Sequence, residues 1–187
     1  MTEITMKTWG QYLTEKHGQV YDFSSTQINL PDDLAKKAMD FGKTIPDDEL
    51  KVENDEGKGR EDDIHVTVLY GLHAEKPDQV KKLIKDIKPF EITLGKVSAF
   101  ETNKEFDVVK IEVESPELRK LNKLLSDKCE NSNSYPDYHP HVTIAYVKKG
   151  NAKKYIGNKS FVGKTFKATE ITFSSKNGSR IALPFAD

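Results

Sequence analysis

The sequence predicts an α+β fold made of two related lobes, and three observations lead to this prediction. Segments of helical periodicity alternate with segments of strand periodicity along the chain. A pattern that begins His-Val-Thr and ends in tyrosine occurs twice, at 65–70 and 141–146. The copies lie in different halves, each after a helix and a loop, which indicates two lobes rather than a solenoid. The 187 residues suit a single domain, 1–187, with one shared core.

Helices are expected where apolar residues recur at three- and four-residue spacing after a start signal. Proline and aspartate open one helix at 31–33, and Gly42 is expected to close it. Ser115 precedes Pro116, which is the arrangement of an N-cap followed by the first helical turn. The expected helices cover residues 5–16, 31–41, 77–87, 116–125 and 152–156.

Strands are expected where apolar and polar residues alternate, or where short apolar runs lie between turn residues. A turn at 102–105 joins two of them, and the last two form a hairpin at Asn177-Gly178. Both copies of the repeated pattern fall on strands. The expected strands cover residues 26–30, 64–71, 90–101, 106–114, 141–147, 166–175 and 180–185.

The segment 44–63, directly before the first copy of the pattern, is rich in charge and poor in apolar residues. Two interpretations remain open for it. It is either a flexible surface loop or a lid that covers a bound substrate.

The composition favours a small anionic ligand over a long nucleic acid. The chain has 29 basic and 30 acidic residues, whereas a protein that binds a long duplex through its phosphates is expected to be basic. Cys129 is the single cysteine, so no intrachain disulfide forms, which is typical of a reducing compartment. No apolar run resembles a signal peptide or reaches the length of a membrane span. A cytoplasmic protein without membrane contact is expected.

The repeated His-Val-Thr motif puts two pairs of reactive side chains on strands. Residues i and i+2 of a strand point to the same face, so His65 projects with Thr67, and His141 with Thr143. Each pair is separated by roughly 6–7 Å along its strand. If the two strands lie side by side, the pairs face each other across a cleft. One such motif usually means nothing, but two identical copies favour a functional site.

Such a site suits phosphoryl chemistry. One neutral imidazole can take a proton from an attacking oxygen, while the other, protonated, donates to the leaving oxygen. The ordinary pKa of histidine, about 6.5, leaves both forms accessible near neutral pH. The threonine hydroxyls can hydrogen-bond the non-bridging phosphate oxygens. No metal is required, and the pH–rate profile is expected to be bell-shaped. The symmetry of the motifs leaves open which histidine is the base.

The two motifs, HVTV and HVTI, resemble the signature of the 2H phosphoesterase superfamily. The resemblance covers about residues 24–183 and implies a bilobal α+β fold, with two antiparallel sheets and flanking helices around a central cleft. It implies catalysis without a cofactor by four residues: His65, Thr67, His141 and Thr143. The superfamily includes RNA ligase-like cyclic phosphodiesterases and phage anti-CBASS enzymes, which degrade cyclic oligonucleotide signals of host defence. STQINLP before the first motif and FSSK near the end look most like the phage group, whose enzymes act in the host cytosol.

A nucleobase in the cleft would need a flat side chain to stack on. Phe106, in the hairpin after the turn at 102–105, and Tyr138, in the loop before the second motif, are the candidates. Tyr70 and Tyr146 are expected, by strict alternation, to lie on the face opposite the histidines and to pack in the core.

Other polar residues have two interpretations each. A His-x-His pair with nearby aspartates is a candidate metal site, although the intact second motif favours a histidine at the entrance of the strand instead. The residues of this alternative are His139, His141, Asp62, Asp63 and Asp137. Three cations are candidates for neutralising a second phosphate, with solvated surface charge as the alternative: Arg60, Lys176 and Arg180. His73 is a candidate ligand contact, with a solvated loop residue as the favoured interpretation.

The function predicted from the sequence is cleavage of a nucleotide phosphodiester, either in a cyclic oligonucleotide or in a 2′,3′-cyclic phosphate. One alternative is a nucleotide-binding module that sequesters or senses its ligand without turnover. Another is a protein that processes the ends of longer RNA strands, which the near-zero net charge disfavours. The base, the linkage, the ring size and the oligomeric state are left open.

Overall fold

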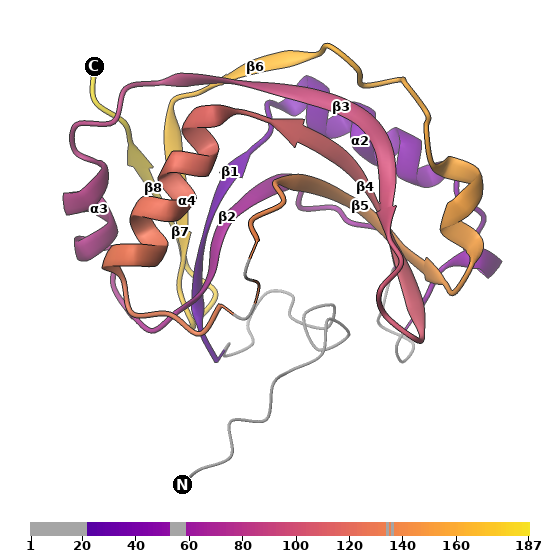
Figure 1. Ribbon diagram of the computed structural model, residues 1–187, viewed down its shortest axis with the longest axis horizontal. Helices are drawn as coiled ribbons and strands as arrows, with labels where there is room; N and C mark the ends of the chain where they lie inside the picture. Colours follow the sequence, from indigo (N-terminus) through magenta and orange to yellow (C-terminus); the bar gives the residue numbers. More distant parts are fainter. Residues whose placement is uncertain (1–21, 53–58, 134, 136) are drawn as a thin grey trace, which may run out of the picture.

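The computed structural model describes residues 22–52, 59–133, 135 and 137–187, so the helix expected over 5–16 lies outside it. The described part combines helices with strands that pair antiparallel, which confirms the α+β class (Figure 1). The helices are α2 (Asp32–Lys43), η1 (Asp47–Glu49), α3 (Asp78–Ile84), α4 (Pro116–Lys128) and η2 (Asn151–Tyr155), where η marks 3-10 helices. The strands are β1 (Ser24–Asn29), β2 (His65–Leu72), β3 (Phe90–Phe100), β4 (Phe106–Glu114), β5 (His141–Lys148), β6 (Thr165–Ala168), β7 (Glu170–Ser174) and β8 (Arg180–Pro184).

The strands form one antiparallel sheet in the order β6-β3-β4-β5-β2-β1-β7-β8. Two separate sheets were expected, but β2 and β5 pair at the centre through Val66 and Val142 and join the halves. Both strands begin one residue before this pair and run in opposite directions, so they overlap only near their starts. Figure 1 shows the sheet curled into an arch, with β2 and β5 in its middle.

The curl brings the two ends of the sheet together. A single strand was expected over 166–175, but the chain leaves β6, which pairs with β3, and enters β7, which pairs with β1. Only Thr169 lies between them, although β6 and β7 are far apart in the strand order. The strand breaks at Thr169 because its two parts pair with different strands. The alternation of residues within 166–175 does not reveal this change of partner.

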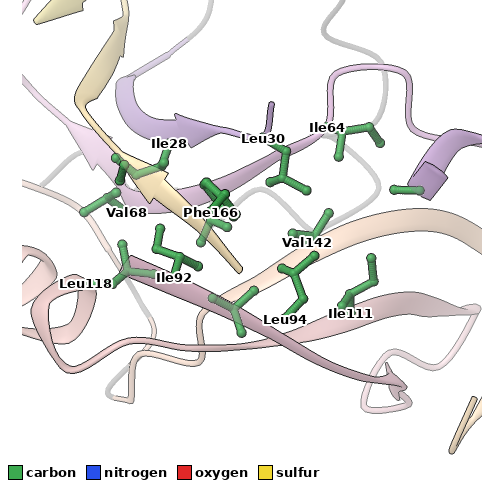
Figure 2. Packing of buried hydrophobic residues seen from close by; sticks show 14 of the residues in the cluster. Ile28, Leu30, Ile64, Val68, Ile92, Leu94, Ile111, Leu118, Val142 and Phe166 are labelled. Atoms are coloured by element: carbon green, nitrogen blue, oxygen red, sulfur yellow. The ribbon is translucent and has the colours of Figure 1, made fainter. Parts of the chain in front are cut away.

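One cluster of buried side chains joins the two halves of the sheet. Ile28 of β1 and Val68 of β2 lie near Ile92 of β3 and Phe166 of β6 (Figure 2). The middle valines of both motifs, Val66 and Val142, are 0% exposed. Burial of an aliphatic side chain of this size stabilises the fold by about 1.5–3 kcal/mol. The alternation predicted for the two motifs is confirmed, and their histidines and threonines face the other side.

A helix packs against each motif strand. Helix α4 contacts β2, where Asn122 Nδ2 donates to the Val68 carbonyl over 2.7 Å. Helix α2 contacts β5, and Gly42 lies so close to Ile144 that an added Cβ would be 3.3 Å from Ile144 Cγ2. Helix α2 ends at Lys43, so the prediction that Gly42 closes the helix was wrong. The close packing against Ile144 explains why this position is a glycine.

The charged segment 44–63 is partly structured in its described portions. It contains η1, and Leu50 and Arg60 form isolated bridges with Val147 and Ala145 of β5. Its middle, 53–58, lies outside the described residues. In the described part of the chain, no helix is long and apolar enough to cross a membrane.

Candidate active site

A cavity of about 560 Å³ is lined by all four residues of the two motifs: His65, Thr67, His141 and Thr143. Its volume lies in the range of pockets that hold small ligands. The antiparallel pairing of Val66 with Val142 explains the arrangement, because it puts the residues on either side of each valine on one face of the sheet. The structure thus brings together the residues that the sequence singled out.

A β-bulge follows the first motif. The pairing of β2 with β1 shifts between Thr67 and Leu69, which leaves Val68 as an extra residue. Beyond a bulge the alternation of faces moves by one residue. Tyr70 therefore lines the same cavity as His65.

Strand β5 has the same irregularity at the equivalent place. Its pairing with β4 shifts directly after Thr143, which leaves Ile144 as the extra residue. Tyr146 therefore lines the cavity, where it is 7% exposed and meets Phe106 edge-on. The prediction that Tyr70 and Tyr146 face away from the histidines was wrong, because strict alternation does not hold across a bulge. Tyr146 is nevertheless buried, as expected, in a cluster with Phe106 and Val108.

His65 lies against the aspartate two residues before it. Its Nδ1 is 2.7 Å from the Asp63 carbonyl oxygen and 3.2 Å from the Asp63 carboxylate. Burial lowers the pKa of His65, but the carboxylates of Asp63 and Glu61 outweigh this and raise its pKa above the ordinary value. Because Nδ1 is occupied, Nε2 is the nitrogen left for a ligand. His65 is therefore suited to carry a proton near neutral pH.

Arg180, at the start of β8, holds the Asp63 carboxylate with two hydrogen bonds. Arg180 Nη1 lies 2.9 Å from Asp63 Oδ1, and Nη2 lies 2.6 Å from Oδ2. Burial raises the pKa of Asp63, but the hydrogen bonds from His65 and Arg180 bring it well below the usual range. Arg180 was a candidate for a second phosphate, and the structure shows it paired with a carboxylate distant in sequence.

His141 has a different environment. Its Nδ1 is 2.7 Å from the His139 carbonyl oxygen, and its ring meets the Phe100 ring edge-on at a centroid distance of 4.8 Å. Burial, together with the positive charges of Lys110, His65 and His139, lowers the pKa of His141 to about 4. His141 is therefore neutral at the pH where His65 is charged.

Lys110 of β4 is a buried cation that sequence reasoning missed. It is 8% exposed, its Nζ donates to Ser98 Oγ over 2.7 Å, and it lies 4.4 Å from the centroid of the Phe100 ring. It stands opposite Thr143 in the β4–β5 register. A single lysine in an alternating strand normally faces solvent, so the local pattern gives no signal for this position.

The two aromatic candidates for base stacking occupy different positions. Phe106 lines the cavity but is 1% exposed, so it supports the wall without presenting a ring face. Tyr138 also lines the cavity, and its hydroxyl donates to the Thr67 carbonyl over 2.8 Å, which holds β2 at the first motif. Phe100 is half-buried in the lining beside His141, and sequence reasoning did not single it out.

Two of the candidate cations and one histidine lie elsewhere. Arg60 pairs with Asp47, Lys176 lies 3.9 Å from Glu75, and neither of these two cations is among the residues that line the cavity. His73 is also outside the lining, and its Nε2 lies 2.6 Å from a serine hydroxyl.

The residues of the metal-site alternative all line the cavity: Asp62, Asp63, Asp137, His139 and His141. Among the residues that the structure describes, no group of three or more histidine, cysteine or carboxylate side chains is arranged to hold a metal ion. The Nδ1 atoms of His65 and His141 face backbone carbonyls instead.

Several solved structures share the fold over most of the chain. TT0787 of Thermus thermophilus has a TM-score of 0.62 at 13% identity, with 86% of this chain and 94% of that chain covered. E. coli LigT complexed with NADP+ has a TM-score of 0.58 at 19% identity, covering 87% and 94%. Kluyveromyces marxianus Usb1 has a TM-score of 0.56 at 12% identity, covering 88% and 99%. At such identities the likeness shows the fold alone.

No curated protein sequence matches the chain. A family model, described as the 2′-5′ RNA ligase superfamily, matches residues 48–180. The matched stretch is more than half of the chain and contains both His-Val-Thr motifs together with Asp63, Lys110 and Arg180. The resemblance noted in the sequence is thereby confirmed at the level of the superfamily: the chain belongs to the 2′-5′ RNA ligase superfamily, the 2H phosphoesterases.

Proposed function

We propose that this protein is a metal-independent phosphodiesterase that cleaves nucleotide phosphodiester bonds by acid–base catalysis at His65 and His141. The observation that supports this most directly is the single cavity lined by both histidines and both motif threonines. The two imidazoles have pKa values displaced in opposite directions, so at a pH between the two values His65 is protonated while His141 is neutral. That combination is what simultaneous proton donation and acceptance requires.

The threonines complete the site. Thr67 and Thr143 line the same cavity as their histidines, and we expect their hydroxyls to donate to the non-bridging oxygens of a bound phosphate. Such donors stabilise the transition state, in which these oxygens gain charge, more than they stabilise the bound substrate, and so they lower the barrier.

A small nucleotide is the proposed substrate. LigT has been solved in complex with NADP+ and with 3′-AMP, and Usb1 with uridine monophosphate, so related folds hold nucleotides. Within this class we favour a cyclic oligonucleotide signal, as degraded by phage anti-defence enzymes, or a nucleoside 2′,3′-cyclic phosphate. The likeness of STQINLP and FSSK to the phage group supports the first of these.

Turnover of a substrate panel in the presence of EDTA tests the proposal. The panel contains cyclic di- and trinucleotides with 3′–5′ and 2′–5′ linkages and a nucleoside 2′,3′-cyclic phosphate. The wild type is compared with His65→Ala and His141→Ala. Each variant should lose about 10²–10⁴-fold in turnover, the usual contribution of one acid or base. EDTA should leave the wild-type rate unchanged.

His73→Ala is the matched control, because His73 lies outside the cavity lining and should retain nearly full activity. Loss of activity with EDTA, restored by a divalent metal, would contradict metal independence. Tight binding of one nucleotide without turnover of any panel member would instead identify a nucleotide-binding module.

A further inference from the structure

The two histidines make the same backbone contact but have opposite charges beside them. Each Nδ1 lies 2.7 Å from the carbonyl oxygen two residues earlier. Beside His65 stands the Asp63 carboxylate, at 3.2 Å. Phe100 lies beside His141, and the Lys110 ammonium lies 4.4 Å from the centroid of the Phe100 ring. The two copies of the motif thus have the same sequence, but the charged groups next to their histidines differ in sign.

We propose that Asp63 and Lys110 are positioning residues that assign the two roles: His65 donates the proton to the leaving oxygen, and His141 accepts the proton of the attacking oxygen. This inference rests on the proposed function, because it divides the chemistry of that same site. Neither Asp63 nor Lys110 belongs to the repeated motif, and both act through a histidine.

The Asp63 carboxylate is fixed in place. Arg180 binds both of its oxygens, at 2.9 and 2.6 Å, and Gln27 Nε2 approaches at 3.5 Å. A fixed anion beside Nδ1 favours the imidazolium form of His65 and sets the orientation of its ring. The proton on Nε2 is then available to a leaving oxygen in the cavity.

Lys110 has the converse effect on His141. Its ammonium is buried, held by Ser98 Oγ at 2.7 Å and by the face of Phe100. A cation in a poorly solvated place disfavours a second positive charge nearby, so His141 stays neutral and able to accept a proton. Lys110 stands opposite Thr143 in the β4–β5 register but is not among the residues that line the cavity.

Charged groups face each histidine from several elements. Those around His65 come from the segment before β2, from β8 and from β5: Glu61, Asp62, Asp63, Arg180 and His141. Those around His141 come from β4, the loop before β5 and β2: Lys110, Glu112, Asp137, His139 and His65. Glu112 raises the pKa of Lys110 against the effect of burial and so helps keep it charged. Within the described residues, a carboxylate forms an ion pair with the ring of His65 and not with that of His141.

With these roles, each proton transfer in the reaction can be assigned to one histidine. The substrate 2′-hydroxyl loses its proton to His141 and bonds to phosphorus, the P–O5′ bond breaks, and the departing O5′ takes a proton from His65. The products are a 2′,3′-cyclic phosphate and a free 5′-hydroxyl, with atoms and protons balanced. The leaving nucleoside then lies on the β2 side of the cavity and the attacking ribose on the β5 side.

A leaving group that needs no proton distinguishes acid from base. Two substrates are compared, adenylyl-(3′→5′)-adenosine and adenosine 3′-(4-nitrophenyl phosphate), whose 4-nitrophenolate departs as an anion. His65→Ala should lose about 10²–10⁴-fold on the dinucleotide and no more than about tenfold on the aryl ester. His141→Ala should lose activity on both, because the attacking hydroxyl still needs a base.

Three other outcomes have distinct meanings. Rescue of His141→Ala instead of His65→Ala by the aryl ester would overturn the assignment while leaving the two-histidine function intact. Equal losses on both substrates in both variants would also overturn it. Wild-type activity retained by both variants on both substrates would refute the proposed function itself.

The positioning roles are tested by pH–rate profiles of four variants. Asp63→Asn keeps the backbone carbonyl contact but removes the charge, so the alkaline limb, set by His65, should move to lower pH. Arg180→Gln leaves the Asp63 anion less neutralised, so the same limb should move to higher pH. Lys110→Met should move the acid limb, set by His141, to higher pH, and Lys110→Arg should leave it in place.

A structural role alone would reduce the rate or the melting temperature without these opposite shifts. Limbs that stay unchanged in Asp63→Asn and Lys110→Met would overturn the positioning roles. The leaving-group comparison remains decisive even if one of these variants folds poorly, since it uses different substitutions.

Discussion

His65 and His141 are held by equivalent contacts, since each Nδ1 lies 2.7 Å from the carbonyl oxygen two residues before it. This contact occupies Nδ1 in both rings and leaves Nε2 for the cavity. The rings differ because burial, together with the charge of Lys110, lowers the pKa of His141, whereas the carboxylate of Asp63 raises that of His65. The motif determines where the rings lie, and burial together with the flanking charges moves their pKa values in opposite directions.

The motif threonines give a prediction at the same scale. Thr67→Val and Thr143→Val keep the shape of the side chain but remove a donor to the phosphate, so kcat should fall about 10²-fold or more with a smaller change in KM. Steady-state kinetics on the preferred panel substrate provide the measurement. Thr67→Ser, which retains the hydroxyl, should recover most of the rate. An unchanged kcat in both valine variants would mean that the hydroxyls do not contact the transition state.

The secondary-structure elements were largely predictable from the sequence, because they depend on local periodicity and local caps. The strand at 106–114 has the expected bounds, and Ser115 Oγ accepts from the Leu118 amide at 3.3 Å, as its predicted N-cap role requires. The bulges at Val68 and Ile144 were not predictable. They depend on the register of neighbouring strands, which the residues of one strand do not encode.

The cap of α4 provides a prediction for an element away from the cavity. Ser115→Ala removes the acceptor of the Leu118 amide and should lower the free energy of unfolding by about 1 kcal/mol. Urea denaturation followed by circular dichroism measures it. Activity at a temperature well below the transition should be unchanged, since Ser115 is not part of the cavity lining. A stability equal to that of the wild type would show that the cap contributes nothing.

At the scale of the whole molecule, the curl of one sheet produces the site. Strands from both halves meet at Val66 and Val142, and residues far apart in sequence, such as Asp63 and Arg180, come into contact. The sequence predicted which motif residues share the cavity because the two copies are identical. It could not predict the single continuous sheet, the Asp63–Arg180 pair or the buried Lys110, because each depends on long-range strand pairing.

The nearly neutral charge of the molecule and the small size of its cavity predict a weak response to salt. With a net charge of -1 and one or two phosphates bound, KM should rise about tenfold or less between about 50 and 200 mM salt. Initial rates on a cyclic dinucleotide at several salt concentrations provide the measurement. A fall in affinity of about 10³-fold or more would instead indicate many phosphate contacts and a longer RNA substrate.

The pH–rate profile of the wild type tests the central claim, two histidines in opposite protonation states, most directly. His141 must be neutral, so activity should be lost on acidification through its pKa of about 4. His65 must be protonated, so activity should be lost as pH rises through a pKa raised above 6.5. The predicted kcat/KM profile is a bell between these limits, with circular dichroism confirming a folded protein throughout. A rate that rises continuously with pH, without an alkaline limb, would contradict the account.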